Sequence, residues 1–338
     1  MTSLKDVAKL AGVSVGAVSR YLNEPQRLRE STRRKIAPAI EALNYSPNSL
    51  ARSLRRGKTG LVMVVCSAIG DPYFGDVIYG IQRGAKEHGM TVLVREVRSI
   101  HERPSEASDI VLSRKADGVI VLGSNSPFDL TADAHRKVDH PPVVVGGEIV
   151  SRLLQPLPSV RIDNVAAAQE VTRYLIGLGH RRLGFIAGEP GSPMLDDREI
   201  GFRDVLSQND IPISPEHRVH GDLTVEGGRR AMRHLMTLRS PPTAIVSAND
   251  EMAIGAIGEA RAMGVAIPDD VSIVGFDDIR YSAAMNPPLT TVAQPAEAIG
   301  EQCFYRLIRA LAEPGSETGV QIVPHKLVIR ESAAPPRR

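Results

Sequence analysis

Residues 4–23 read LKDVAKLAGVSVGAVSRYLN, and this stretch decides the fold of the N-terminal part of the chain. From Leu4 to Ala11 the apolar residues recur at i, i+3, i+4 and i+7, which predicts a helix with one apolar face. Gly12 then occupies the position at which helices commonly end in a left-handed residue. Ser14 can cap a second helix directly after this turn.

The second helix has an apolar spacing of its own, with Val18 and Leu22 four residues apart on its inner face. Two short helices joined by a glycine turn form the arrangement that places the second helix in the major groove of DNA. The stretch therefore predicts a helix-turn-helix unit and a nucleic-acid partner.

A third helix is expected to complete this unit. Ser31 is a suitable N-cap, and Ile36, Ile40 and Leu43 are spaced to share one buried face. Pro38 lies within the same segment. Because proline lacks a backbone donor, we expect it to bend or shorten the helix there.

A short arginine-rich segment follows at residues 46–60, SPNSLARSLRRGKTG. Ser46 can cap it, Pro47 suits the first helical position and Gly57 ends it, which leaves about nine helical residues. Isolated helices of fewer than about 12 residues are marginal in water, so this one is expected to form only against its copy or against DNA. An apolar wedge beside arginines is how minor-groove proteins unstack a base step. The side chains concerned are Arg52, Arg55, Arg56 and Lys58, for phosphates, and Leu50 and Leu54, on one side.

Charge is distributed unevenly along the 338 residues. Residues 1–58 contain 12 Lys and Arg against 4 Asp and Glu, whereas the remainder contains 29 against 35. A basic head on an acidic body indicates a polyanionic partner for the head only, with a solvated basic tail as the alternative. The length predicts two or three domains.

The first stretch, followed by NYSPNSLARSL at residues 44–54, resembles the headpiece and hinge helix of the LacI/GalR family of bacterial transcriptional repressors. The resemblance implies a homodimer whose paired hinge helices open the centre of a near-palindromic operator, with Leu54 as the wedge. By family position, Val15 and Gly16 begin the recognition helix. The DNA-binding residues that the resemblance implies are Ser3, Lys5, Ser14, Val15, Gly16, Ser19, Arg20, Asn23, Thr32, Asn48, Ala51, Arg52, Leu54 and Arg55.

The chain departs from the common family pattern in its recognition helix. Gly16 has no side chain with which to read a base, and Ala17 stands where a threonine is usual. Base readout is therefore expected to depend on Val15, Arg20 and the wedge residue Leu54.

Strands and helices alternate from Leu61 onward, and they do so in two series. This rhythm predicts two lobes, each a doubly wound parallel sheet. The expected strands are 61–68, 90–97, 117–123, 143–145, 182–188, a short edge near Arg218, 243–249, 272–278, 289–295 and a final pair around 321–329. The expected helices are 76–88, 104–115, 164–178, 197–209, 225–238, 250–263 and 296–312.

The family resemblance extends over this body, and its motifs are VRIDN (160–164), LGHRRLGFIAG (178–188), PTAIVSAND (242–250), PDDVSIVGFDD (268–278) and PPLTTVAQP (287–295). It implies an all-α helix-turn-helix headpiece joined to an α/β periplasmic-binding-protein-like body of two doubly wound lobes. Three chain crossings are expected between the lobes, near residues 161–163, 290–292 and 323–324. The expected domains are 1–46 (headpiece), 47–59 (hinge helix), 60–161 with 292–323 (first lobe) and 162–291 with 324–338 (second lobe).

A ligand of such a body is expected beyond the carboxyl ends of the strands. By family position, Arg198, Asn249 and Asp277 are polar effector ligands, and Tyr73 and Phe74 supply apolar or stacking surface. A charged fork, an amide and a carboxylate suit hydroxyl groups, although an arginine could equally hold a carboxylate or phosphate. Simpler roles remain open, namely helix capping by Asp250 and Asp277, core packing by Tyr73 and Phe74, and a surface ion pair of Arg198 with Asp196 or Asp197.

Two departures from the family pattern leave the chemical identity of the effector open. Leu223 stands where a stacking aromatic is frequent, and Gly146-Gly147 precede Glu148 where many relatives have an acidic residue directly after the strand. A sugar, a sugar acid, a sugar phosphate or another small polyol derivative would each be consistent with these residues.

Two other classes of protein share this architecture. An enzyme would need catalytic marks, but the chain has no GxxxxGK[ST] phosphate loop and no HExxH motif, and His180 fits a structural turn histidine better than a general base. An exported solute-binding protein would need a signal peptide, whose pattern is missing from the N-terminus. We therefore expect no catalytic residues, metal or cofactor.

The remaining expectations concern location and partners. Cys66 and Cys303 look like core residues of a protein in a reducing compartment, and no apolar run approaches the ~18 residues of a membrane span. A cytoplasmic, nucleoid-associated protein is expected. No leucine heptad follows Ile329, which favours a dimer over a tetramer. The expected partners are double-stranded operator DNA, a small-molecule effector and a second copy of the chain, with no membrane.

Overall fold

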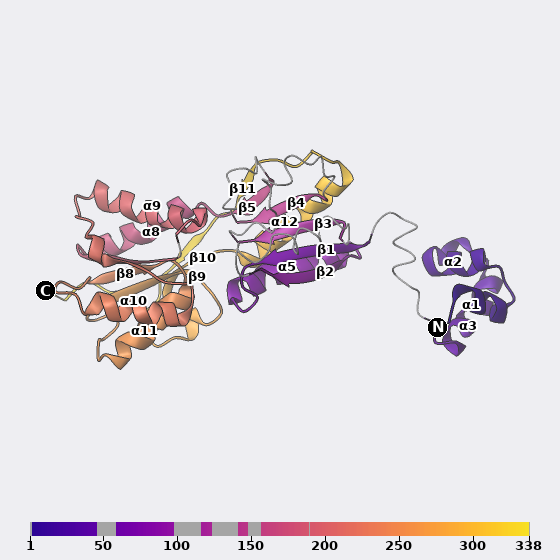
Figure 1. Cartoon of the computed structure of the whole chain (residues 1–338), viewed down its shortest axis with the longest axis horizontal. Helices are drawn as coiled ribbons and strands as arrows, with labels where there is room; N and C mark the ends of the chain where they lie inside the picture. The colour runs from indigo at the N-terminus through magenta and orange to yellow at the C-terminus, as the bar shows by residue number, and fades with distance from the viewer. Residues whose placement is uncertain are drawn as a thin grey trace. The chain divides into compact units, whose positions relative to one another are not determined.

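The computed structural model of the chain describes residues 2–45, 59–97, 116–123, 141–147, 157–188 and 190–337. The chain divides into two compact units, residues 1–59 and residues 60–338 (Figure 1). The arginine-rich hinge helix expected within residues 46–58 and the helix expected at 104–115 lie outside the described residues.

In its described residues the N-terminal unit is all-helical, as predicted. It contains α1 (Leu4–Ala11), α2 (Val15–Asn23), a 3-10 turn (Pro25–Arg27) and α3 (Glu30–Ala42). The three helices enclose a small core to which each contributes its apolar face, so the predicted spacings are confirmed. The fully enclosed residues are Val7, Ala8, Val18, Ile36 and Ala39.

Local capping fixes the turn between the first two helices. The Ser3 hydroxyl and the Asp6 side chain form a reciprocal capping box at the start of α1. Gly12 ends that helix at φ 63°, in the left-handed region. The Ser14 hydroxyl then accepts a hydrogen bond from the Ala17 N–H at 3.2 Å, as predicted for the cap of α2.

The predicted N-cap of the third helix was wrong. Its N-cap is Arg29, so Ser31 lies inside the first turn instead of capping it. An acidic residue is favourable in the first turn of a helix, and Glu30 occupies that position. Pro38 does not shorten the helix, which continues to Ala42.

Among its described residues, the body contains two six-stranded sheets, one in each lobe (Figure 1). The first has the strand order β11-β5-β4-β3-β1-β2, and all neighbouring strands are parallel. Both β1 and β3 are almost wholly buried, which explains their continuous apolar sequences. The strands are β1 (Leu61–Cys66), β2 (Thr91–Glu96), β3 (Gly118–Leu122), β4 (Val143–Gly146), β5 (Ser159–Arg161) and β11 (Val320–Ile322).

The second sheet has the order β12-β10-β9-β8-β6-β7, in which only the pair of β12 with β10 is antiparallel among the described strands. The doubly wound parallel fold predicted for each lobe is therefore confirmed. The strands are β6 (Leu183–Ala187), β7 (Arg218–His220), β8 (Ala244–Ser247), β9 (Ser272–Asp277), β10 (Thr290–Ala293) and β12 (Lys326–Val328).

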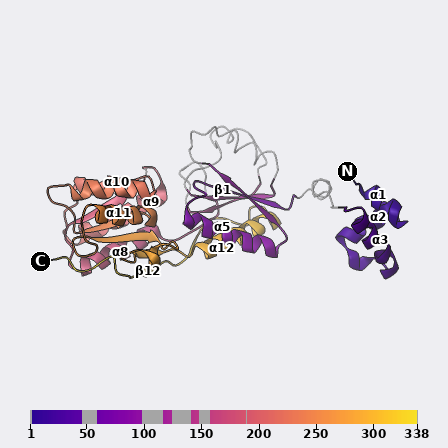
Figure 2. The ribbon, with the colours of Figure 1, turned by 90° about the horizontal axis from the view of Figure 1, so that it is seen from below.

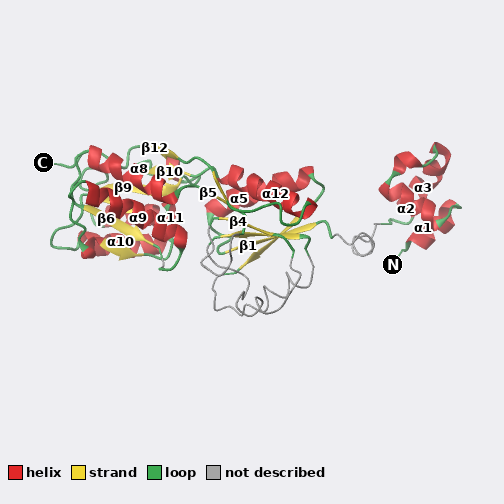
Figure 3. Cartoon of the chain, turned by 90° about the horizontal axis from the view of Figure 1, so that it is seen from above, coloured by secondary structure: helices red, strands yellow, loops and turns green. Residues whose placement is uncertain are grey.

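Helices cover the faces of these sheets. In the second lobe α8 (Asn164–Gly177) and α9 (Pro193–Gln208) lie on one face, and α10 (Val225–Met236) and α11 (Asp250–Ala262) lie on the other (Figure 1). In the first lobe α5 (Pro72–Glu87) and α12 (Ala296–Ala312) lie side by side on one face (Figures 2 and 3). No helix among the described residues is both long and apolar enough to cross a bilayer.

Several element boundaries differ from the predicted ones. Helices α5 and α9 begin at Pro72 and Pro193, four residues earlier than expected, because a proline suits the first helical position. The strand β5 was not predicted. β10 remains paired with β9 as far as Ala293, so the boundary proposed at residue 292 falls inside that strand.

Helices α5 and α12 pack closely enough that their backbones touch. A Cβ atom on Gly80 would lie 2.1 Å from the Glu297 carbonyl oxygen, and one on Gly300 would lie 2.0 Å from the Val77 carbonyl oxygen. Glycine is therefore required at both positions for this approach. The contact holds the start of α5 beside Gln294 and Pro295, the segment that links β10 to α12.

Candidate functional site

The start of α2 presents an exposed surface in the N-terminal unit. Val15 is 42% exposed, and Gly16 and Arg20 are exposed beside it, while Ser19 is half-buried. Packing does not require glycine at position 16, since the nearest atom to a Cβ there is the Ser14 hydroxyl oxygen at 3.8 Å. The helix thus offers a short, largely apolar edge with one guanidinium, a shape that fits a groove of DNA.

The other expected DNA-binding residues have different surroundings. The hydroxyls of Ser3 and Ser14 cap helices, Lys5 is exposed and Thr32 is half-buried. Asn23 ends α2. Asn48, Ala51, Arg52, Leu54 and Arg55 lie outside the described residues.

The chain contains a GxSxG sequence at residues 12–16, GVSVG, which is also the spacing of a nucleophile elbow. Such an elbow places its serine between a strand and a helix. Here Ser14 lies between two helices, and its hydroxyl accepts the capping hydrogen bond from the Ala17 N–H. The motif is structural in this chain.

Arg198 is the centre of a buried polar cluster in the second lobe. Its side chain extends from the first turns of α9 and is only 2% exposed. Nε donates to Asn164 Oδ1 at 3.0 Å, and Nη1 donates to the Ala248 carbonyl oxygen. The guanidinium also stacks 3.9 Å from the centroid of the Phe276 ring. The surface ion pair considered for Arg198 is therefore excluded.

Asp277 completes the cluster at the carboxyl end of β9. Its Oδ1 lies 3.5 Å from Nη2 of Arg198. Burial raises the pKa of Asp277 well above its ordinary value, and the positive charge of Arg198 opposes that shift. Asp277 has φ 112°, a conformation that is strained for any residue with a side chain and that recurs at functional sites. It does not cap a helix.

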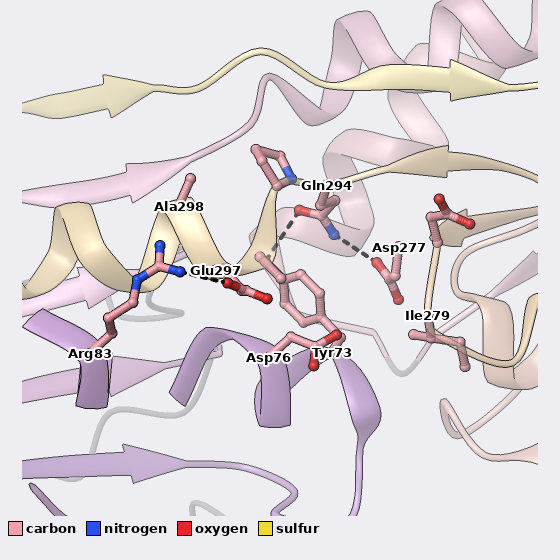
Figure 4. Close-up of a pocket in the computed structure, with 11 residues that line it drawn as sticks. Tyr73, Asp76, Arg83, Asp277, Ile279, Gln294, Glu297 and Ala298 are labelled. Carbon is pink, nitrogen blue, oxygen red and sulfur yellow. Dashed lines mark hydrogen bonds and ion pairs between the residues drawn. The ribbon is translucent and has the colours of Figure 1, made fainter. Parts of the chain in front are cut away.

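A hydrogen-bonded bridge joins this carboxylate to the first lobe (Figure 4). Gln294 Nε2 donates to Asp277 Oδ1 at 2.6 Å, and the Tyr73 hydroxyl donates to Gln294 Oε1 at 3.3 Å. Tyr73 lies at the start of α5, Asp277 ends β9, and Gln294 belongs to a crossing between the lobes. The bridge therefore depends on the relative position of the two lobes.

A cavity of about 420 Å³ opens beside the bridge (Figure 4). Its walls come from both lobes and from the segment between them. The lining residues are Tyr73, Asp76, Arg83, Asp277, Asp278, Ile279, Gln294, Pro295, Ala296, Glu297 and Ala298. Of the six expected effector residues, the cavity includes Tyr73 and Asp277, and Arg198 lies directly behind Asp277.

Asn249 and Leu223 are tied to each other. Asn249 is the N-cap of α11, with its Oδ1 accepting from the Met252 N–H at 3.1 Å. Its amide nitrogen donates to the Leu223 carbonyl oxygen at 3.0 Å. Leu223 has φ 64°, and its side chain is half-buried. The Asn249 side chain is therefore used at both ends: its oxygen caps α11, and its nitrogen fixes the loop at Leu223.

The remaining aromatic and acidic residues at the end of β1 have structural contacts. Phe74 is only 8% exposed and packs in the core of the body. Asp71 caps α5 by accepting from the Tyr73 N–H at 2.9 Å. Burial raises the pKa of Asp71.

Asp250 lies in the first turn of α11, but its carboxylate turns toward the sheet. Oδ2 accepts from the Ile279 N–H at 3.0 Å and from the Ser282 hydroxyl at 2.6 Å, while Oδ1 accepts from the Thr291 hydroxyl at 2.6 Å. A Cβ on Gly275 would lie 2.1 Å from Oδ1, so a glycine is needed beneath it. Asp250 thus ties α11 to β10 instead of capping its own helix.

Sequence reasoning missed Asn164 and Gln294. Both belong to motifs that had been recognised, VRIDN and PPLTTVAQP, but neither was assigned a role. His180 hydrogen-bonds Thr243 Oγ1 and the Ala334 carbonyl oxygen, each at 2.9 Å, which agrees with a structural turn histidine. In the part of the chain that the structure describes, no three His, Cys, Asp or Glu side chains gather as metal ligands.

Comparison with known proteins gives matches along the whole chain. Residues 3–48 match the model for bacterial regulatory proteins of the lacI family, and residues 172–333 match that for a periplasmic binding protein-like domain. The chain is 34% identical over 330 residues to the HTH-type transcriptional repressor CytR of Escherichia coli (strain K12), covering 98% of this chain and 96% of the relative. It is 33% identical over 337 residues to the probable HTH-type transcriptional repressor ExuR of Bacillus subtilis (strain 168), covering 98% of each.

Solved structures show the same architecture. The lac repressor dimer bound to operator and the anti-inducer ONPF superposes with a TM-score of 0.86 and 26% identity, over 98% of this chain and 99% of that one. The complex of the transcriptional regulator CelR with cellobiose superposes with a TM-score of 0.74 and 28% identity, over 98% of this chain and 100% of that one.

Proposed function

Because the chain belongs to the lacI family of bacterial regulatory proteins, we propose that it is a transcriptional repressor whose affinity for operator DNA is set by a small-molecule effector. The main support for the proposal is that one chain contains both a folded helix-turn-helix unit and a two-lobe body with a polar cavity. Full-length relatives that are named repressors support it.

In the N-terminal unit, the exposed edge of α2 reads the operator. Val15 contacts base methyl groups and Arg20 donates to base acceptors in the major groove, while Lys5 and Thr32 bind phosphates. The phosphate contacts supply a salt-dependent affinity for any DNA sequence. Leu54 opens a base step at the centre of the operator, and this role remains a prediction from the sequence.

Two copies of the chain bind one operator. The lac repressor, to which this chain is similar over nearly its whole length, was solved as a dimer on its operator. Two recognition helices about one helical turn apart would match a near-palindromic site. A homodimer is therefore the form that we propose for DNA binding.

An effector in the cavity regulates this affinity by changing the angle between the lobes. The bridge from Tyr73 through Gln294 to Asp277 links both lobes at the cavity, so a ligand that competes for its hydrogen bonds shifts the lobe equilibrium. Coupling of this kind is typically about 1–3 kcal/mol, or roughly 5- to 150-fold in operator affinity. Cellobiose in the CelR complex supports a sugar or a sugar-like effector.

A solute-binding protein or an enzyme on the same two-lobe fold is the alternative, and no observation favours it. Neither class requires a DNA-binding unit. The relatives that match along the chain are transcriptional regulators, so we propose a non-catalytic protein.

Sequencing of genomic fragments bound by the full-length protein tests the proposal. We expect a small set of enriched loci that persist as salt is raised, while the background of other fragments falls steeply. Arg20→Ala should abolish the enrichment and leave the salt-sensitive background. Arg34→Ala is the matched control, because this exposed arginine on α3 is not an expected base contact. Uniform recovery of all fragments by the unmodified protein would refute the proposed function.

A further inference from the structure

A second cavity lies inside the second lobe, apart from the cavity between the lobes. It has a volume of about 210 Å³ and is bounded by β6, α9 and the segment 213–218. Two of its lining residues, Leu183 and Arg218, are the first residues of β6 and β7. The cavity therefore lies near the amino ends of these strands, whereas the cavity between the lobes meets Asp277 at the carboxyl end of β9. The two cavities share no lining residue.

The inner wall of this second cavity is apolar and partly aromatic. Phe185 from β6 and Phe202 from α9 are both buried, with ring centroids 5.0 Å apart and an interplanar angle of 33°. Ile213 is 39% exposed and so lies at the rim. A dry apolar cavity of about 150 Å³ is large enough for a benzene ring, so this one has room for a ring with a small substituent. The apolar lining residues are Leu183, Phe185, Phe202, Ile213 and Pro215.

The segment that covers the cavity is held in place by its own contacts. Ile211 is buried just before it. His217 is also buried, and its Nε2 donates to the Ser240 carbonyl oxygen at 2.7 Å. Pro215 begins a 3-10 turn between these two anchors. A cavity with a fixed cover is preformed, so a ligand binds without the cost of ordering a loop.

The acidic residue of the lining is fully engaged by one arginine. Arg218 Nε donates to Glu199 Oε1 at 2.6 Å, and its Nη2 donates to Glu199 Oε2 at 2.8 Å. The third nitrogen of this guanidinium, Nη1, lies 2.7 Å from His220 Nε2. The pair ties α9 to β7, and its two charges neutralise each other.

A second arginine at the cavity leaves positive charge in excess. Arg203 Nη1 lies 3.8 Å from Glu199 Oε1, which is too long for a hydrogen bond, and the Arg203 side chain is 58% exposed. Its guanidinium has no hydrogen-bonding partner among the described residues. The Ser214 hydroxyl, also in the lining, makes no capping hydrogen bond. An apolar cavity therefore has donors at its edge and, among its Asp, Glu, Lys and Arg side chains, two basic groups against one acidic group.

We propose that this cavity is a second ligand site, for a small aromatic monocarboxylate. The ring of the ligand packs against Phe185 and Phe202, and its carboxylate accepts from Arg203, whose planar fork suits that group. A second carboxylate on the ligand would meet Glu199, which favours a single negative charge. The inference concerns binding to the second lobe alone, so it depends neither on an operator nor on an effector between the lobes.

Helix α9 takes part in both sites. Arg198 and Glu199 are consecutive residues, and successive side chains point about 100° apart around a helix axis. Arg198 extends into the polar cluster with Asp277, whereas Glu199 lines the second cavity. A ligand in the second cavity thus rests against the same helix that positions the guanidinium of the cluster.

Titration of the full-length protein with small probes tests the proposal. Benzoate and phenylacetate have a ring and one carboxylate, benzamide is the neutral counterpart of benzoate, and acetate has the charge without the ring. Calorimetry and ligand-observed NMR should give saturable binding of the two aromatic acids with Kd of about 0.1–1 mM. Benzamide should bind about tenfold more weakly, and acetate should not saturate the protein. Failure of both aromatic acids to saturate the protein, or equal affinity for benzamide and benzoate, would overturn the proposal.

Exposed positions allow variants that place the ligand. Arg203→Gln should weaken benzoate binding by about five- to tenfold and leave benzamide unchanged, because only the carboxylate loses its partner. Arg261→Gln is the matched control, since Arg261 is an exposed arginine on α11 of the same lobe. Ile213→Ala should weaken both compounds by about two- to fivefold through lost apolar contact. Thermal unfolding confirms that each variant is folded, and benzoate affinity unchanged by Arg203→Gln would place the ligand elsewhere and refute the assignment.

Discussion

Asp250 makes the stability of the body depend on pH, in a direction opposite to that of most surface carboxylates. Its side chain is fully buried, and burial raises its pKa from 3.8 to about 7, although three donated hydrogen bonds oppose the shift. The folded state therefore holds the proton up to a higher pH than the unfolded chain does. Stability from this group is fully present below about pH 3.8 and is lost as the pH rises through about 7.

The size of the effect follows from the two pKa values. Each pKa unit corresponds to about 1.4 kcal/mol, so the free energy of unfolding should fall by about 2.5 kcal/mol between roughly pH 5 and pH 8 through this residue alone. Other buried acids also titrate, so a variant is needed to isolate the contribution. Asp250→Asn imitates the protonated form, because the Thr291 hydroxyl can turn to accept from the new amide.

Urea unfolding of both proteins at a series of pH values provides the measurement. Between roughly pH 5 and pH 8, the free energy of unfolding of the variant should rise by about 2.5 kcal/mol relative to that of the unmodified protein. Asp204→Asn makes the same chemical change on an exposed position of α9 and serves as the matched control. A constant difference for Asp250→Asn would refute the reasoning.

Three further outcomes are expected. Leu54→Ala should weaken binding to the preferred operator and reduce its bending in a gel-phasing assay, and unchanged bending would remove Leu54 from the wedge role. Asp277→Ala should abolish the response of operator affinity to the effector while leaving DNA binding intact, as seen by fluorescence anisotropy; a normal response would contradict its place in the site. Gly300→Ala places a methyl group 2.0 Å from the Val77 carbonyl oxygen and should destabilise the body by about 1–3 kcal/mol in thermal unfolding. The same change at Gly258, a helical glycine with open space around it, should be neutral or stabilising, and equal losses at both sites would argue against the close helix contact.

Local rules predicted the headpiece well because its decisive interactions are close in sequence. Ser14 caps a residue three positions later, and Gly12 ends the helix that precedes it. The start of α5 was placed too late although its signal was present. Asp71 followed by Pro72 is a cap followed by a proline at the first helical position, which places Tyr73 and Phe74 inside the helix.

The candidate site was only partly predictable, since its geometry depends on segments that are distant in sequence. Family position selected Arg198 and Asp277 as candidates, but the position of the Arg198 guanidinium behind the carboxylate depends on Asn164 and Ala248, from other elements. Alternation of strands and helices carries no information about such contacts. Gln294 was missed for the same reason, because its partners belong to opposite lobes.

The glycine contact between α5 and α12 has a mechanical consequence. Where two backbones touch, no side chain can yield between them, so the helices tilt together as a lever. Tyr73 lies at one end of α5, and Gln294 lies just before the same end of α12. With 16 residues, α5 extends about 24 Å from Pro72 to Glu87, so a movement at its start is shared with α12 over that length.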